Sequence, residues 1–217
     1  MSAAKPKAGE RLRFPGVRAP KPLLAPDVEA RLTERQRQLL GELERLLMED
    51  GLAELTMAEI AARANCSLRT LYGLAPSKEE LALTVVDRRL HRIGRTAIAS
   101  LDASLAPLAA LRAYLQAANE AVQPETVTFG RSFAKVPGAK RLLDSHEEYV
   151  IAVVRSLLDR AVAEGHIGAV DTASLAHLLG GLGREFARSD MLEIAAAPPK
   201  ATANAMMEII LRGLERG

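Results

Sequence analysis

The sequence predicts an all-α protein, and three observations lead to this fold class. Hydrophobic residues make up 48% of the 217 residues, whereas aromatic residues make up only 3% and tryptophan is absent. Alanine, leucine, arginine and glutamate dominate, while runs of the β-branched and aromatic residues typical of strands are hard to find. Apolar residues recur at three- and four-residue steps along most of the chain. A chain of this length can hold one or two domains, each with a hydrophobic core.

The N-terminal segment differs in composition from the rest of the chain. Residues 1–26 contain five of the eleven prolines, and six lysines or arginines against a single acid, Glu10. Prolines at this density prevent a regular helix, and the segment has little apolar surface to offset the entropy lost on ordering. We therefore predict a disordered basic arm over residues 1–30. It is either a solvated tail or a segment that contacts phosphates or the minor groove of DNA. Its basic residues are Lys5, Lys7, Arg11, Arg13, Arg18 and Lys21.

Three short or medium helices are expected next. The first begins near residue 31 and ends before Gly51, a helix stop. Thr56 followed by Glu59 matches a capping box, which predicts a short helix over residues 56–64 and a second over 67–74. Ser77 and Glu80 repeat the pattern and open a long helix that continues through Ile93. The first of these helices carries an apolar stripe formed by Leu39, Leu40, Leu43, Leu46 and Leu47.

A larger helical body is expected to follow. Its further helices are predicted over residues 105–122, 124–134, 139–164, 171–189 and 200–215, with prolines at or near several starts. Gly165 and Asp171 serve as the expected stop and cap between the helices over residues 139–164 and 171–189. The predicted organisation is a disordered arm over 1–30, a helix-turn-helix domain over 31–78, and a helical-bundle ligand-binding and dimerisation domain over 79–217, with about nine helices in all.

The pair of short helices fits a helix-turn-helix. Such a unit needs a small residue where the second helix crosses the first, and a residue tolerant of left-handed φ in the turn. Ala61 fills the small position, and Asn65, four residues later, fills the turn. Apolar residues also occur at the offsets that lock the crossing angle: Ile60, Ala64, Cys66, Leu71 and Leu74. The alternative on these residues alone is an ordinary αα-hairpin.

The run TMAEIAARANCSLRTLY, followed by PSKEEL, resembles the DNA-binding region of the TetR/AcrR family of bacterial transcriptional regulators. With the preceding helix and the lead-in MEDGLAELT, the resemblance covers about residues 34–83. The rest of the chain is similar to the family in the number and lengths of its helices, and it weakly resembles the ligand-binding half of the AefR-like branch. The resemblance implies a homodimeric repressor that binds a palindromic operator in double-stranded DNA. A small apolar ligand that enters the helical body would release it.

The resemblance also implies residue roles. Thr56 falls where the family places a hydroxyl near phosphate, and Ser67, Leu68, Arg69 and Thr70 fall on the exposed N-terminal face of the recognition helix. Arg69 is the expected base reader, because a guanidinium can bind guanine through two hydrogen bonds. Tyr72 and Lys78 fall at positions that the family uses against the DNA backbone.

Two positions depart from the family pattern. The family usually has an aromatic residue at the place of Ala75 and a bulky or polar residue at the place of Gly73. A glycine within a helix lowers its stability by about 1 kcal/mol relative to alanine. Two alternatives therefore stay open. One is a ligand-binding or scaffolding helical dimer that has lost operator binding, and the other is a non-specific nucleic-acid binder that relies on the basic arm.

The helical body supplies candidate ligand and dimer residues. Aromatic and imidazole groups on its predicted helices are candidates to surround an unknown small apolar ligand, with core packing as the alternative: Tyr114, Phe129, Phe133, His146, Tyr149 and His177. The last two helices are expected to form the dimer interface, with Gly180, Gly181 and Gly183 allowing close approach across the two-fold axis. The expected interface residues are Leu175, Leu178, Leu179, Gly181, Leu182, Phe186, Met207, Ile210, Leu211 and Leu214, with Met206 on the same face.

Other chemistry is not indicated. The four histidines show no metal-ligand spacing with Cys66 or with paired acids, so no metal site is predicted. The sequence has no glycine-rich phosphate loop and no nucleophile elbow, so we expect no catalytic residues, no cofactor and no enzymatic activity. The single cysteine fits a reducing compartment. Without a leader or an apolar run of about 18 residues, we expect a cytoplasmic protein with no membrane partner.

Overall fold

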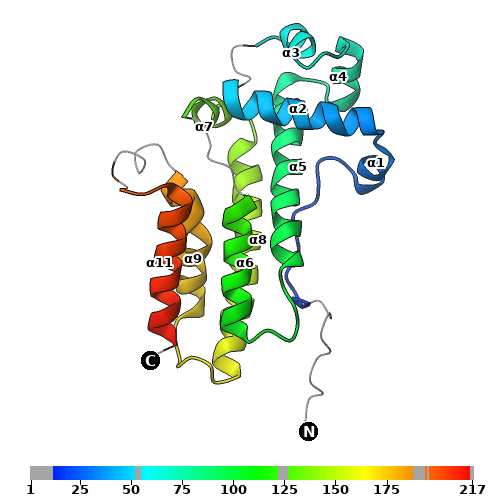
Figure 1. The fold of residues 1–217 in the computed structure, drawn as a ribbon. Helices are drawn as coiled ribbons and strands as arrows, with labels where there is room; N and C mark the ends of the chain where they lie inside the picture. Colours follow the sequence, from blue (N-terminus) through cyan, green and yellow to red (C-terminus); the bar gives the residue numbers. More distant parts are fainter. Residues whose placement is uncertain (1–11, 52–54, 122–126, 188–193, 195, 216–217) are drawn as a thin grey trace. The chain divides into compact units, whose positions relative to one another are not determined.

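The structure of the protein is a computed structural model that describes residues 12–51, 55–121, 127–187, 194 and 196–215. These residues form ten helices and no strand, which confirms the predicted all-α class (Figure 1). The helices are α1 (Pro26–Arg31), α2 (Glu34–Asp50), α3 (Met57–Arg63), α4 (Leu68–Leu74), α5 (Lys78–Ala99), α6 (Pro107–Ala121), α7 (Val127–Phe133), α8 (Ala139–Ala163), α9 (Thr172–Ala187) and α11 (Pro199–Leu214).

The chain divides into two compact units. The head unit comprises Pro20–Arg92 and Glu125–Ser145, and the body unit comprises Met1–Ala19, Ile93–Pro124 and His146–Gly217. The head unit therefore takes in more of the chain than the 31–78 expected from the sequence. The first half of α5 and the whole of α7 contribute buried residues to its core, which accounts for the larger extent.

The core of the head unit is built on α2. Thr33 caps this helix: its hydroxyl accepts from the Gln36 amide at 3.2 Å, and the Gln36 side chain accepts from the Thr33 amide at 2.8 Å. Gly51 ends the helix with φ of 68°, a conformation that favours glycine. Between these ends the predicted leucine stripe is buried, together with apolar side chains from α3, α4, α5 and α7.

Ion pairs join α5 to the other helices of the head unit. Arg92 donates to the Glu44 carboxylate of α2 through its two terminal nitrogens, Nη2 at 2.6 Å and Nη1 at 3.0 Å. Arg88 binds Glu29 of α1 at 2.9 Å. Because the Glu44 and Glu29 side chains are largely shielded from solvent, these pairs are screened less than the (i, i+4) pairs on the outer faces.

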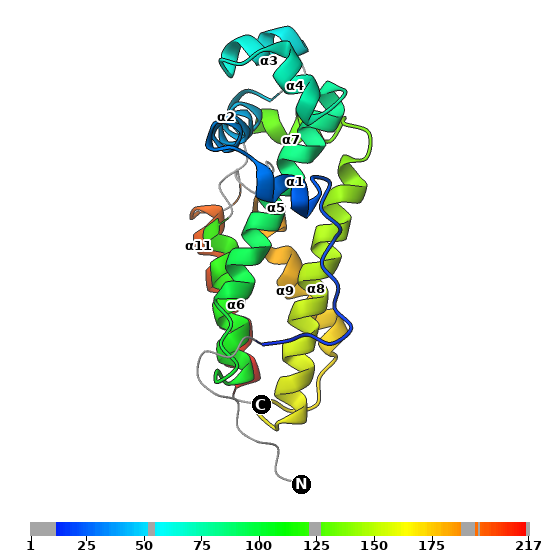
Figure 2. The same ribbon diagram turned by 90° about the vertical axis from the view of Figure 1, so that its right-hand side faces the viewer.

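The core of the body unit lies among α6, α8, α9 and α11. Figures 1 and 2 show α11 running beside both α6 and α9. Gly165 ends α8 with φ of 71°. Asp171 caps α9 by accepting from the amides of Ala173 and Ser174, both at 3.1 Å, so the stop and the cap fall where the sequence places them. The fully buried side chains include Leu111, Tyr114, Leu157, Leu158, Met207 and Leu211.

Polar pairs fix α11 against α6. Arg112 binds Glu208 at 2.8 Å, and the Asn119 amide donates to the side chain of Asn204 at 2.8 Å. A buried or half-buried polar pair holds one register between two helices, because sliding either helix would leave its donors and acceptors without partners.

The prediction of a disordered arm over residues 1–30 is wrong from residue 12 onward. Leu12, Phe14 and Val17 pack against the core of the body unit, and Leu24 packs against the core of the head unit. The prolines do exclude a helix over residues 12–25, but these apolar residues between them bury enough surface to order the chain.

The second half of this segment is also tied by polar contacts. The amide of Leu23 donates to the Asp87 carboxylate at 2.8 Å, and Pro26 begins α1 at a position where its missing N–H is tolerated. Among the arm's basic residues, Arg13, Arg18 and Lys21 are exposed. Lys5, Lys7 and Arg11 lie outside the described residues.

The glycines of α9 serve packing within the chain. A Cβ at position 180 would lie 3.0 Å from Cγ1 of Ile151 on α8, and a Cβ at position 183 would lie 2.9 Å from Oδ1 of Asn119 on α6. The expectation that these two glycines allow close approach across a two-fold axis is therefore corrected, because they allow close approach to α8 and α6. At Gly181 the nearest neighbour would be a carboxylate oxygen of Glu147 at 3.7 Å, an ordinary contact.

In the described part of the chain, no helix combines the length and the apolar character that crossing a membrane requires.

The environments of Gly181 and Gly183 predict opposite effects of the same substitution on stability. Gly181→Ala should raise the free energy of unfolding by up to about 1 kcal/mol, the difference in helix propensity between the two residues. Gly183→Ala should lower it, because the new methyl group displaces Asn119 from its bond to Asn204. Urea unfolding of both variants checks this. A Gly183→Ala protein as stable as Gly181→Ala would show that the Asn119–Asn204 bond adds nothing.

Candidate nucleic-acid interface

The start of α3 is fixed by a complete capping box. The Thr56 hydroxyl accepts from the Glu59 amide at 3.2 Å, and the Glu59 carboxylate accepts from the Thr56 amide at 2.7 Å and from the Thr56 hydroxyl at 2.8 Å. These hydrogen bonds to the carboxylate, the one from the backbone first, lower the pKa of Glu59. The capping box predicted from the sequence is confirmed.

The turn between α3 and α4 depends on Asn65. Its φ of 49° is the only positive φ among the non-glycine residues that the structure describes. The amide of Cys66 then bonds back to the carbonyl of Ala61 at 2.9 Å, and Arg35 of α2 donates to the carbonyl of Asn65 at 2.9 Å. The predicted left-handed turn is confirmed, and α2 supplies a brace that the sequence did not reveal.

The small and apolar positions of the predicted unit are filled as expected. Ile60, Ala61, Ala64 and Leu71 are buried in the core of the head unit. Cys66 is half-buried against the same core, and burial raises the pKa of its thiol, which keeps the thiol protonated. This favours an ordinary packing role for the cysteine.

Helix α4 presents one face to solvent. Ser67 caps it by accepting from the Thr70 amide at 3.1 Å, and the two hydroxyls lie 2.8 Å apart. Ser67, Leu68 and Arg69 are exposed, and Thr70 is half-buried. Tyr72 is 54% exposed, one turn further along (Figure 2 shows α3 and α4).

The two departures from the family pattern have different environments. Gly73 is exposed, and a Cβ at this position would meet no heavy atom within 4 Å. Ala75 is buried at the end of α4 in the core of the head unit, and Leu74 packs against the same core. Neither residue interrupts α4, which keeps its full length from Leu68 to Leu74.

Lys78 begins α5 and is half-buried. Its charge and that of Arg63 both help to lower the pKa of Glu59, so these cations lie close to the capped start of α3. Ser77 accepts from the Glu80 amide at 3.1 Å, as the second capping pattern predicted. Helix α4 thus belongs to one small structural unit with the first residues of α3 and α5. This unit presents hydroxyl, ammonium and guanidinium groups.

A comparison with known families identifies this unit. Residues 39–85 match the family described as bacterial regulatory proteins, tetR family, and the match spans α3, the Asn65 turn and α4. The resemblance seen in the sequence is thereby confirmed over residues 39–85, a region that includes Gly73 and Ala75.

Solved structures of TetR-family regulators extend the likeness to the whole fold. The regulator PfmR from Thermus thermophilus has 25% sequence identity and a TM-score of 0.61, over 82% of this chain and 98% of that chain. A regulator from Rhodobacter sphaeroides has 22% identity and a TM-score of 0.65, over 81% and 97%. One from Haloarcula marismortui has 18% identity and a TM-score of 0.67, over 84% and 99%. No curated protein matches the sequence.

The six candidate ligand residues are divided between the cores of the two units or lie outside them. Tyr114 is buried and Tyr149 half-buried in the core of the body unit. Phe129 and Phe133 stack on each other, with ring centroids 5.3 Å apart, in the core of the head unit. His146 is buried on α8, whereas His177 is exposed on α9.

The expected dimer residues divide into buried and exposed sets. Leu179, Met207 and Leu211 are buried in the body unit's own core and are not available to a partner, which corrects part of the expected interface. Leu178 is 51% exposed, and Met206 and Ile209 are 43% and 66% exposed. The apolar face expected on α11 did not include Ile209. The others are half-buried: Leu175, Gly181, Leu182, Phe186, Ile210 and Leu214.

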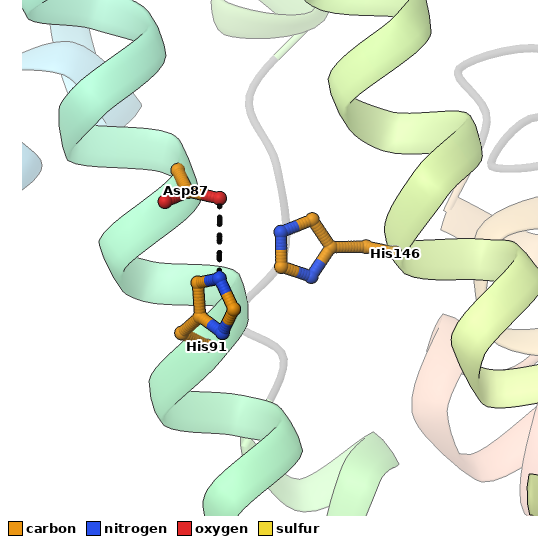
Figure 3. Close-up of side chains that lie close together, drawn as sticks. All are labelled: Asp87, His91 and His146. Atoms are coloured by element: carbon orange, nitrogen blue, oxygen red, sulfur yellow. Dashed lines mark ion pairs between the residues drawn. The ribbon is translucent and has the colours of Figure 1, made fainter. Parts of the chain in front are cut away.

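An acid–imidazole pair on α5 was not singled out from the sequence. Asp87 and His91 lie one turn apart, with 3.5 Å between Asp87 Oδ1 and His91 Nε2 (Figure 3). Asp87 is buried and uses its other oxygen to accept from the Leu23 amide at 2.8 Å. The (i, i+4) spacing was visible in the sequence, but the burial that makes the pair notable depends on how residues 20–32 pack on α5.

A first prediction concerns the two unusual positions of α4. Gly73→Ala should raise the free energy of unfolding by about 0.5–1 kcal/mol, because the methyl group meets open space and alanine favours the helix. Ala75→Phe should lower it by about 1–3 kcal/mol, because the site is already enclosed by the core. Thermal unfolding of both proteins measures these effects. A stabilised Ala75→Phe protein would instead reveal unfilled space beside Leu74.

A second prediction concerns the charge of Glu59. Its pKa is lowered in the folded state from 4.5, so the stability that the carboxylate contributes is present above that value and is lost as the pH falls through the lowered pKa. Glu59→Gln keeps a side chain able to cap and has no charge to lose. The melting temperature of the native protein should therefore exceed that of Glu59→Gln at pH 7, and the difference should shrink as the pH falls below 4.5 and through the lowered pKa. A difference independent of pH would assign the effect to shape instead of charge.

Proposed function

We propose that this protein is a homodimeric TetR-family repressor that binds a palindromic operator in double-stranded DNA and is released by a small apolar effector. The single observation that supports this most directly is the recognition helix. It is capped at Ser67, held by the Asn65 turn, anchored by buried Leu71 and exposed along the face that carries Arg69.

Base recognition is assigned to Arg69. It is the only arginine of α4, it is exposed, and it lies in the first turn of the helix, the part that helix-turn-helix proteins place against base edges. A guanidinium in the major groove can donate two hydrogen bonds to a guanine. Leu68 and Thr70, on either side of it, offer a methyl-contacting surface and a hydroxyl.

Backbone contacts are assigned to three other residues. Thr56 at the start of α3 and Lys78 at the start of α5 offer a hydroxyl and an ammonium to phosphates, and Tyr72 offers a phenol hydroxyl. Helix N-termini such as those of α3 and α5 also favour the negative charge of phosphate. Phosphate contacts position a protein on DNA and add affinity without adding sequence preference.

Dimerisation is assigned to the outer faces of α9 and α11. Leu178, Met206 and Ile209 are large apolar side chains that remain exposed on these two helices. Exposed apolar side chains on adjacent helices favour association, and a two-fold contact buries the same surface on both subunits. A two-fold symmetric dimer in turn presents two copies of α4 to a palindromic site.

The effector is assigned to the body unit. Helical bundles hold small ligands between facing helices, and the core among α6, α8, α9 and α11 is predominantly apolar. Tyr114 and Tyr149 are the candidate residues within this core, and His146 on α8 and exposed His177 on α9 are candidates on the same unit.

Operator recognition yields a test of the whole proposal. Selection from random duplexes by the purified protein should recover a palindrome with two equivalent half-sites. Arg69→Ala should then weaken binding by about 1–3 kcal/mol and relax the preference at one base pair of each half-site. Thr56→Ala and Lys78→Ala serve as matched controls, because they should weaken binding about evenly across sequences. Recovery of no palindrome would favour a dimer that has lost operator binding.

The dimer assignment yields a separate test. Leu178→Glu combined with Ile209→Glu should produce monomers in sedimentation velocity, because two carboxylates per subunit would have to be buried at the contact. Val28→Glu is the control, since Val28 is an exposed apolar residue on α1 of the head unit. A double variant that sediments like the Val28→Glu protein would place the contact on other residues.

A further inference from the structure

The body unit contains a fully buried hydroxyl that has no hydrogen-bond partner among the described residues. Tyr114 lies on α6 with no exposed surface, and its hydroxyl oxygen makes no hydrogen bond to any residue of the described chain. Leaving such a group without a partner costs about 1–3 kcal/mol, and a phenylalanine of the same shape would avoid that penalty. The position therefore has free hydrogen-bonding capacity inside an apolar core.

Tyr114 belongs to the apolar core of the body unit. Leu111, Leu157, Leu158 and Met207 are buried in the same core. Burial, and secondarily the nearby Tyr149, raise the pKa of the Tyr114 hydroxyl, so it keeps its proton and acts as a donor. Arg160 of α8 has a buried guanidinium nitrogen, but this side chain pairs with Glu164 at 2.6 Å and donates to the carbonyl of Leu105, so its charge is already compensated.

We propose that the Tyr114 hydroxyl donates a hydrogen bond to a neutral acceptor, such as a ketone or ester carbonyl, on an otherwise apolar ligand of the body unit. This rests on the proposed function insofar as that ligand is the effector, and it specifies its chemistry. The apolar part replaces core contacts, and the carbonyl supplies the partner that the chain does not. A carboxylate is not expected, because the Arg160 guanidinium already pairs with Glu164 and burying an unpaired charge is far more costly than burying a carbonyl.

Two volatile probes of matched shape test the proposal. 2-Nonanone has the carbonyl, and 2-methyl-1-nonene replaces its oxygen with a methylene group. Headspace partitioning over the full-length protein gives a dissociation constant for each. Tyr114→Phe should weaken binding of the ketone by roughly threefold to tenfold, the loss of one hydrogen bond. It should leave binding of the alkene unchanged, since the alkene accepts no such bond.

Infrared spectroscopy and stability complete the test. The carbonyl stretch of ¹³C-labelled 2-nonanone should lie at lower frequency on the native protein than on Tyr114→Phe, and ligand-free Tyr114→Phe should melt at a higher temperature than the native protein. Equal ketone affinity in both proteins, no binding of either probe, tighter binding of nonanoate, or a lower melting temperature of Tyr114→Phe would each overturn the proposal. The last outcome would identify an internal water as the partner. None of these measurements uses DNA, so their outcome does not depend on whether the protein binds an operator.

Discussion

At Asn65 the chain leaves α3 with a positive φ and enters α4 within two residues, and the rest of the DNA-binding unit depends on this reversal. The amide of Cys66 can reach the carbonyl of Ala61 only because of it, and the small side chain of Ala61 lets the second helix approach. Arg35 closes the arrangement from α2 by binding the carbonyl at the turn. A β-branched residue at this position would be strained at such a φ, and the face of α4 that carries Arg69 would then point elsewhere.

The elements that were predictable share a local cause. The capping box at Thr56, the left-handed Asn65, the stop at Gly165 and the cap at Asp171 are each decided by residues within four positions along the chain. Hydrogen bonds over such distances form almost regardless of the tertiary surroundings. This is why both helices of the DNA-binding unit, and most of the helix ends, could be placed from the sequence.

What could not be predicted depends on distant partners. Phe14 and Leu24 are sparse apolar residues among prolines, and their burial is decided by cores built from residues far along the chain. The glycines of α9 could equally have faced a second subunit, and only the positions of Ile151 and Asn119 show that two of them face α8 and α6. The same holds for Tyr114 and Phe129, which are aromatic residues on helices of similar character but belong to different cores.

The contacts of the N-terminal segment have a consequence for the order in which parts of the protein fold. Residues 12–24 leave the ribosome before their partners, because Leu23 bonds to Asp87, and Phe14 packs with residues of helices that are synthesised later still. Contacts between residues so far apart in sequence form slowly, since a long loop must close before they stabilise the fold. During synthesis the segment therefore stays unpaired while the helix-turn-helix, whose contacts are local, already has its partners. Docking of residues 12–24 is therefore expected to be among the last steps of folding.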